Sequence, residues 1–177
     1  ATNLARSFQC WHENTDIRLS LATDQSSYFP EDLGNIEIVP VESGKYGEGF
    51  SPKLHLNELA PAEQTLFVDA DCLCTGPLDE AFDRFAGHDV SVIGRPISEG
   101  EWFGDVSEIC ESFDIPAMPK FNGGVYYLEP GDACDAVYET AQSLKAEYDE
   151  IGFERLRTHP NDEVLVSLAM ALHDQEP

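Results

Sequence analysis

The chain has 177 residues, of which 42% are hydrophobic, which allows one folded domain with a real core and argues against intrinsic disorder. It carries 34 Asp and Glu against 10 Lys and Arg, a formal net charge of −24, which excludes non-specific binding to nucleic acids and anionic membranes because both need basic patches. We expect an acidic, halophilic protein whose self-repulsion is relieved by salt, and the alternative is an acidic mesophilic protein.

Hydrophobic periodicity predicts helices and strands that alternate along the chain. The expected helices are residues 1–14, 53–59, 77–86, 131–150 and 162–173. The expected strands are residues 17–23, 36–40, 65–68, 90–94 and 121–129. Loops are expected at residues 25–34, where a short helix is the alternative, at 43–52, and at 98–119, which reads as a functional loop or lid. The alternation predicts an α/β fold with a mostly parallel sheet flanked by helices.

The five cysteines are odd in number and lack zinc-like spacing, so we expect free thiols in a reducing compartment. No apolar run approaches the roughly 18 residues of a transmembrane helix. The first residues do not form a signal peptide, so the expected location is cytoplasmic. Nothing in the pattern indicates an oligomeric state.

Two carboxylates follow the short apolar strand 65–68. Asp69 and Asp71 are separated only by Ala70, at the strand end where open α/β sheets bind ligands. Two such carboxylates repel each other unless a positive charge lies between them. Asp oxygens suit hard cations, so the pattern favours Mn2+ or Mg2+, and a solvated strand end is the alternative.

An EF-hand calcium loop would place Asp69, Asp71 and Glu80 at its first, third and twelfth positions. Leu73 and Cys74 then occupy positions that require an oxygen ligand and a glycine. The sequence therefore excludes this reading.

A phosphatase of the haloacid-dehalogenase type also begins with a strand and an acidic pair, followed by Gly and Thr. Here Cys72 and Leu73 stand at those two positions. The segment GDACD at 131–135 could mimic the second acidic motif of that family. The phosphatase is therefore the less favoured alternative.

Four segments together resemble nucleotide-sugar glycosyltransferases of the GT-A fold, in particular glycosyltransferase family 8 (glycogenin/galactosyltransferase-like). The segment LFVDADCLCTGPLDEAFD at 66–83 is similar to the family's strand, D-x-D motif and following helix. FNGGVYYL at 121–128 is similar to its F-N-[SG]-G-V strand entry, and NDEVL at 161–165 to its D-Q-x-x-L helix start. A weaker likeness is SPKL at 51–54, where the family has a basic residue.

The resemblance implies a metal-dependent hexosyltransferase that uses a nucleotide sugar, expected to be a UDP-sugar. Asp69 and Asp71 would hold Mn2+ or Mg2+ against the donor diphosphate, and Lys53 would add a second positive charge. The expected partners are this donor and a carbohydrate or glycoconjugate acceptor. The alternative is a non-catalytic module of the same fold that binds a nucleotide sugar or a partner.

The resemblance also implies donor contacts at Asn122, Gly123 and Gly124, where residues without a Cβ let the backbone approach a sugar. Asp24, at the end of an expected strand, would lie near the nucleotide. The alternatives are a plain tight turn at the glycines and a strand-terminating turn at Asp24.

Asp162 and Glu163 are the expected catalytic residues. Asp162 would accept hydrogen bonds from sugar hydroxyls, although its place at a helix start also suits a structural cap. Glu163 replaces the family's Gln, which leaves retention or inversion of the sugar open. Trp102 and Phe103, in the irregular segment 98–119, are candidates for acceptor contact because aromatic faces pack on sugar rings, and a loop that covers the core is the alternative.

We expect a single GT-A-like domain over residues 1–177. Relative to the family, we expect the first strand to be missing from these residues, because the helix that follows that strand is expected at 1–14. These residues also lack the downstream histidine motif that completes the metal site, and His173 has none of the residues that flank that histidine.

Overall fold

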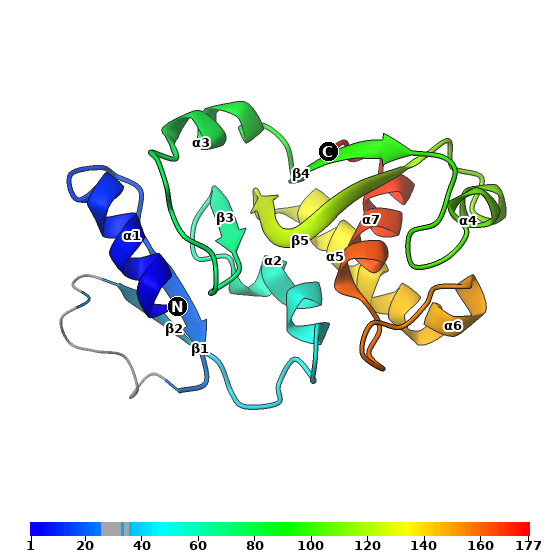
Figure 1. Ribbon diagram of the computed structural model, residues 1–177, viewed down its shortest axis with the longest axis horizontal. Helices are drawn as coiled ribbons and strands as arrows, with labels where there is room; N and C mark the ends of the chain where they lie inside the picture. The colour runs from blue at the N-terminus through cyan, green and yellow to red at the C-terminus, as the bar shows by residue number, and fades with distance from the viewer. Residues whose placement is uncertain (26–32, 34–35) are drawn as a thin grey trace.

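The computed structural model describes residues 1–25, 33 and 36–177, so most of the loop expected at 25–34 lies outside the described residues. Its helices are α1 (Thr2–His12), the 3-10 helix η3 (Ser51–His55), α2 (Leu56–Leu59), α3 (Asp79–Phe85), α4 (Val106–Ser112), α5 (Asp132–Leu144), the 3-10 helix η4 (Lys145–Glu147), α6 (Tyr148–Ile151) and α7 (Asp162–Leu172) (Figure 1). Its strands are β1 (Ser20–Thr23), β2 (Glu37–Pro40), β3 (Thr65–Val68), β4 (Val90–Ile97) and β5 (Met118–Leu128).

The strands form two small sheets, one parallel and one antiparallel. Strands β1 and β2 pair in parallel, whereas β5 lies between β3 and β4 and runs antiparallel to both. The structure is a mixed α/β fold with small sheets, which is compatible with the expected class, but the expectation of a mostly parallel sheet is wrong. The physical reason is the connection 98–117, which leaves β4 at Ile97 and returns directly beside it, with Met118 opposite Ile97. A connection that turns back in this way reverses the strand, and helix–strand alternation does not reveal it.

The irregular segment contains helix α4, which was not expected. Its N-cap is Asp105, whose side chain accepts hydrogen bonds from the backbone N–H groups of Ser107 and Glu108. Similarly, the helix expected at 131–150 is interrupted after Leu144 by a 3-10 turn before α6 begins. Local capping and helix tightening, rather than hydrophobic period, set these boundaries.

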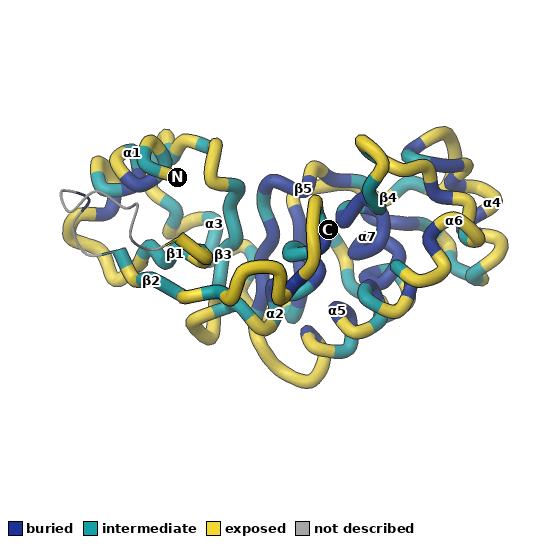
Figure 2. Tube along the Cα trace, turned by 90° about the horizontal axis from the view of Figure 1, so that it is seen from below, coloured by how far each residue is buried: buried dark blue, intermediate teal, exposed yellow. Residues whose placement is uncertain are grey.

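The hydrophobic core lies in the second part of the chain. Helix α7 packs on β5 and α5 packs on α7, and Figure 2 shows buried residues concentrated around these elements. Leu128, Val137, Leu165 and Leu168 have no exposed surface. Each such side chain contributes roughly 1.5–3 kcal/mol by leaving water. The candidate site described next is built on this packed body.

Two further expectations concern cysteines and membranes. All five cysteines are free, as expected: Cys10 is exposed, Cys72 and Cys74 are partly buried, and Cys110 and Cys134 are buried. Among the residues that the structure describes, no helix is both long and apolar enough to cross a bilayer.

Candidate functional site

The end of β3 lies beside the glycine pair of β5. In the antiparallel register Val68 is opposite Val125, so Asp69 emerges next to Gly124. The backbone N–H of Asp69 donates to the carbonyl oxygen of Gly124 over 2.9 Å. Strand pairing therefore brings together two segments that are more than fifty residues apart in the sequence and that both carry expected donor-binding residues.

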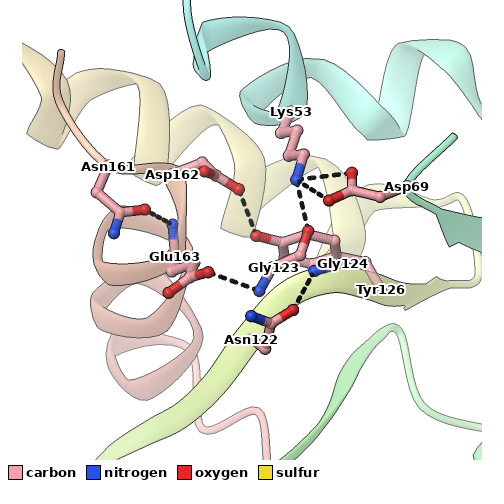
Figure 3. Close-up of polar contacts among 9 residues, drawn as sticks. All are labelled: Lys53, Asp69, Asn122, Gly123, Gly124, Tyr126, Asn161, Asp162 and Glu163. Atoms are coloured by element: carbon pink, nitrogen blue, oxygen red, sulfur yellow. Dashed lines mark hydrogen bonds and ion pairs between the residues drawn. The ribbon is translucent and has the colours of Figure 1, made fainter. Parts of the chain in front are cut away.

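Lys53 connects these two segments to the helix η3 (Figure 3). Its Nζ lies 2.8 Å from Oδ1 and 3.0 Å from Oδ2 of Asp69, and it donates to the carbonyl oxygen of Gly123 over 2.6 Å. The Lys53 side chain is only 19% exposed, which strengthens these charged interactions relative to those on an open surface. One ammonium group thus holds η3, β3 and β5 together.

Gly123 forms the contact with α7. Its backbone N–H donates to Glu163 Oε1 over 2.8 Å, and a Cβ at this position would lie 2.9 Å from both Glu163 Cγ and the Tyr126 hydroxyl. The position therefore requires glycine for space. Asn122 supports the same turn, because its Oδ1 accepts a hydrogen bond from the Gly124 N–H over 3.1 Å.

Asp162 is a buried member of this cluster, with 2% of its surface exposed. The Tyr126 hydroxyl donates to its Oδ2 over 2.6 Å. Burial raises the pKa of Asp162 to about 6, although the hydrogen bond from Tyr126 and the charge of Lys53 oppose that shift. The expected N-terminus of α7 is confirmed, with Asn161 as the cap: its Oδ1 accepts from the Glu163 N–H over 2.9 Å.

Tyr126 is the member of the cluster that sequence reasoning missed. A signal was present, since a tyrosine within a buried strand needs a partner for its hydroxyl. Burial, followed by the Asp162 charge, raises the pKa of Tyr126 well above its usual value, so Tyr126 donates the proton in this bond. The pair fixes the start of α7 against β5.

A cleft of about 800 Å³ opens beside Lys53 and Asp69. Its lining residues are Ala1, Thr2, Asn3, Phe50, Lys53, Asp69, Ala70, Asp71 and Leu73. Asp71 is exposed, and Asp69 keeps 34% of its side chain accessible. The cleft therefore has two carboxylates and the Lys53 ammonium at its wall and residues from the start of α1 on another side.

Other expected site residues are not brought into the cleft. Asp24 is exposed and is not part of the cleft lining. Trp102 is 7% exposed and packs edge-on against Phe121, with ring centroids 6.1 Å apart, and Phe103 packs on the hydrophobic core. These two aromatic residues therefore cover the core, and Trp102 offers no open face to an acceptor.

The carboxylates fit a metal ion only in part. Within the described residues, no group of three or more His, Cys, Asp and Glu is placed to hold a metal. Asp69 and Asp71 both reach the cleft, and their oxygens suit Mg2+ or Mn2+. Such ions are often bound by one or two carboxylates, with phosphate oxygens and water completing the shell. The residues fit that mode and do not form a cage made of protein alone.

The segment 131–135, which would be the second acidic motif of a phosphatase, lies at the end of the β3–β5 pair opposite to Asp69. Thr65, which starts β3, is opposite Leu128, and the segment 131–135 follows Leu128. Asp135 instead accepts a hydrogen bond from Asn57 over 2.8 Å. The two acidic segments are therefore separated by the length of β3.

No protein-family model matches the chain, and neither a curated protein nor a solved structure matches it significantly. The functional assignment therefore depends on the residues of the cluster and the cleft.

Proposed function

We propose that this chain is a metal-assisted glycosyltransferase that moves a sugar from a nucleotide-diphosphate donor, expected to be a UDP-sugar, to an acceptor. The observation that carries the proposal is the convergence of Lys53, Asp69, Gly123 and Glu163 in one hydrogen-bonded cluster. These residues come from four separate segments, and they belong to the four segments that resemble the family.

The donor diphosphate would lie in the cleft at Lys53, Asp69 and Asp71. A bound Mn2+ or Mg2+ at the two carboxylates would stabilise the charge of the diphosphate leaving group. Lys53 lines the cleft and forms an ion pair with Asp69. Its ammonium can therefore turn toward a phosphate oxygen while it stays within the cluster. In a chain with 10 basic residues, this placement supports a role in binding phosphate.

The sugar would lie over the turn formed by Asn122, Gly123 and Gly124. Glu163 is held beside this turn by the Gly123 N–H, where its carboxylate can stabilise positive charge on the sugar or act as a base or nucleophile. Asp162 is hydrogen-bonded to Tyr126 inside the protein, so it orients the start of α7 and thereby Glu163.

A second candidate function is a non-catalytic module that binds a nucleotide sugar. The ion pair of Lys53 favours it, because both oxygens of Asp69 already have a partner in the protein. A polar cluster that is satisfied in this way can serve binding without catalysis.

Release of UDP from UDP-sugars in the presence of Mn2+ distinguishes the two candidates. For the transferase, we expect Asp71→Ala to lower turnover about a hundredfold, as loss of a metal ligand does, whereas Asp83→Ala, at an exposed position on α3, should leave turnover unchanged.

If the wild-type chain binds UDP with Mn2+ but releases none from any donor, the binding module is correct. If neither UDP nor Mn2+ shifts the melting temperature, both candidates are wrong. Glu163→Gln then separates roles within the transferase: an essential carboxylate loses most of kcat, whereas a hydrogen-bonding side chain retains it.

A further inference from the structure

Two basic residues lie directly opposite each other on the β4–β5 ribbon. Arg95 on β4 is the cross-strand neighbour of Lys120 on β5, so both side chains project from the same face. Like charges in this relation repel each other and weaken the sheet. Arg95 and Lys120, called here the basic pair, therefore need a reason beyond stability.

The basic pair has no acidic partner within the part of the chain that the structure describes. Ion pairs hold the charged groups of Lys45, Lys53 and Arg155, whereas other basic residues among those the structure describes, such as Arg84, also have no carboxylate partner. What distinguishes the basic pair is that its two cations face each other across one ribbon. Two adjacent cations without a carboxylate leave their hydrogen-bond donors available to an external anion.

Trp102 helps to position one member of the pair. The Lys120 Nζ lies 5.7 Å from the centroid of the Trp102 ring, within the range of a cation–π interaction. The ring is itself fixed against Phe121 in the core. Lys120 is thus partly ordered before any ligand binds, which lowers the entropy cost of capturing an anion.

Lys120 lies on β5, the strand that carries the candidate site, and Arg95 lies on the neighbouring β4 (Figure 1). Lys120 and Asn122 both reach the surface, and Phe121 between them is buried, so the two polar residues share one face of β5. Their Cα atoms are separated by two strand residues, about 7 Å. The next residue, Gly123, belongs to the cluster with Lys53 and Glu163.

We propose that the basic pair binds an oxyanion, a phosphate or carboxylate group, carried by the acceptor. The guanidinium of Arg95 supplies a planar set of donors suited to such a group, and Lys120 adds a second charge. In the proposed function the donor diphosphate lies at Asp69 and Lys53. An anion bound at the basic pair, on the far side of Asn122, would therefore belong to the acceptor. This last assignment rests on the proposed function, whereas the anion site itself does not.

Isothermal titration of the full chain at constant ionic strength tests the site with four probes: inorganic phosphate, glucose 6-phosphate, glucuronate and uncharged glucose. We expect at least one of the three anions to bind about tenfold more tightly than glucose, and the tighter of the phosphate and carboxylate probes identifies the group. Arg95→Gln combined with Lys120→Gln should remove about tenfold of that affinity. Arg84→Gln, at another exposed arginine that forms no ion pair with a described residue, should leave it unchanged.

Lys120→Glu separates a lost site from a damaged fold. It places opposite charges across the ribbon, so the melting temperature should rise or stay level while anion binding disappears. Lys120→Arg should retain binding. Equal affinity in the wild type and the double glutamine variant, or an equal loss in Arg84→Gln, would overturn the proposal.

Binding of UDP with Mn2+ provides the remaining readout. The double variant should bind UDP as the wild type does. A loss of UDP affinity as large as the loss for the anion would place the pair in the donor site and overturn the acceptor assignment. If the wild type binds no UDP but still binds the anion through the pair, the proposed function fails and the anion site stands.

Discussion

Residues 1–50 and residues 51–177 are stabilised to different degrees. The main hydrophobic cluster runs from Leu54 to Met170 and lies entirely within the second region. The first region contains α1 and the two-stranded sheet of β1 and β2, each strand only four residues long. Its buried hydrophobic side chains, among the described residues, are Ala5, Phe8, Leu33 and Tyr46. A two-stranded sheet with so little burial is marginal by itself.

The difference indicates which part of the candidate site is held rigidly and which part can move. Lys53, Asp69, Gly123 and Glu163 all belong to the second region, so their mutual geometry is held by a packed core. The cleft, by contrast, is also lined by residues from the start of α1. A ligand in the cleft contacts both regions, and it should stabilise the first region more than the second.

The largest expected effect compares one leucine from each region. Leu168 in α7 has no exposed surface, and Leu168→Ala should lower the free energy of unfolding by about 3 kcal/mol through lost burial and the remaining cavity. Leu21→Ala, at a partly exposed position in β1, should cost about 1 kcal/mol. Urea unfolding measures both values. Equal losses would contradict the difference between the regions.

Asp162 provides a test within the packed region. A carboxylate whose folded pKa is raised to about 6 favours the protonated folded state, so its contribution is most favourable below pH 4 and is lost as the pH rises toward 6. The resulting difference between low and neutral pH is about 3 kcal/mol. We therefore expect Asp162→Asn to be more stable than the wild type at pH 8, and no more stable at pH 4.

Urea unfolding at both pH values checks this prediction, with Asp83→Asn as an exposed control on α3. A variant that is as stable as the wild type at pH 8 would contradict it. The expected gain comes with a cost in activity if Asp162 orients the catalytic end of α7, since stability and function then oppose each other.

Gly123 tests how tightly the cluster is packed. A Cβ there would lie within 3.0 Å of Asp162 Oδ2 and closer still to Glu163 and Tyr126, so Gly123→Ala should cost about 2 kcal/mol through overpacking. Gly76→Ala is the matched control, because no atom lies within 4 Å of its Cβ position. Thermal unfolding of the two variants should differ clearly, and an equal melting temperature would show that α7 can move away from β5.

The smallest expected effect is that of salt. Screening of a net charge of −24 should raise the unfolding free energy by about 1 kcal/mol between dilute buffer and molar KCl, about 3 °C in melting temperature. Thermal melts in a KCl series measure it. Maximal stability in dilute buffer would contradict the halophilic character expected from the composition.

Strand and helix positions with clear hydrophobic patterns were predictable from the sequence. The strand 65–68 is confirmed, and the last helix, expected at 162–173, spans Asp162–Leu172. The direction of the strands was not predictable, because it depends on how the long connection 98–117 folds back onto β4. Helix α4 was missed although Asp105 and Glu108 have the spacing of a helix start.

For the candidate site, the sequence predicted which residues take part better than it predicted the contacts between them. Lys53, Asp69, Gly123 and Glu163 were each expected, and the structure brings them into one cluster. The bond between Tyr126 and Asp162 was not foreseen, because it joins residues 36 positions apart and depends on the packing of α7 on β5. Trp102 was a candidate for acceptor contact with a core-covering loop as the alternative, and its large apolar ring packs against Phe121 in the core.

The central place of β5 has a consequence for how the protein loses its site. Candidate-site residues often lie on loops that open easily, but Asn122 and Gly123 lie in β5 between stretches that pair with β4 (118–121) and with both β3 and β4 (126–128), and α7 packs on this strand. The paired amides on either side of these two residues exchange with solvent only when the sheet opens. Ligand affinity should therefore persist through mild denaturation and vanish together with the fold, in a single cooperative step.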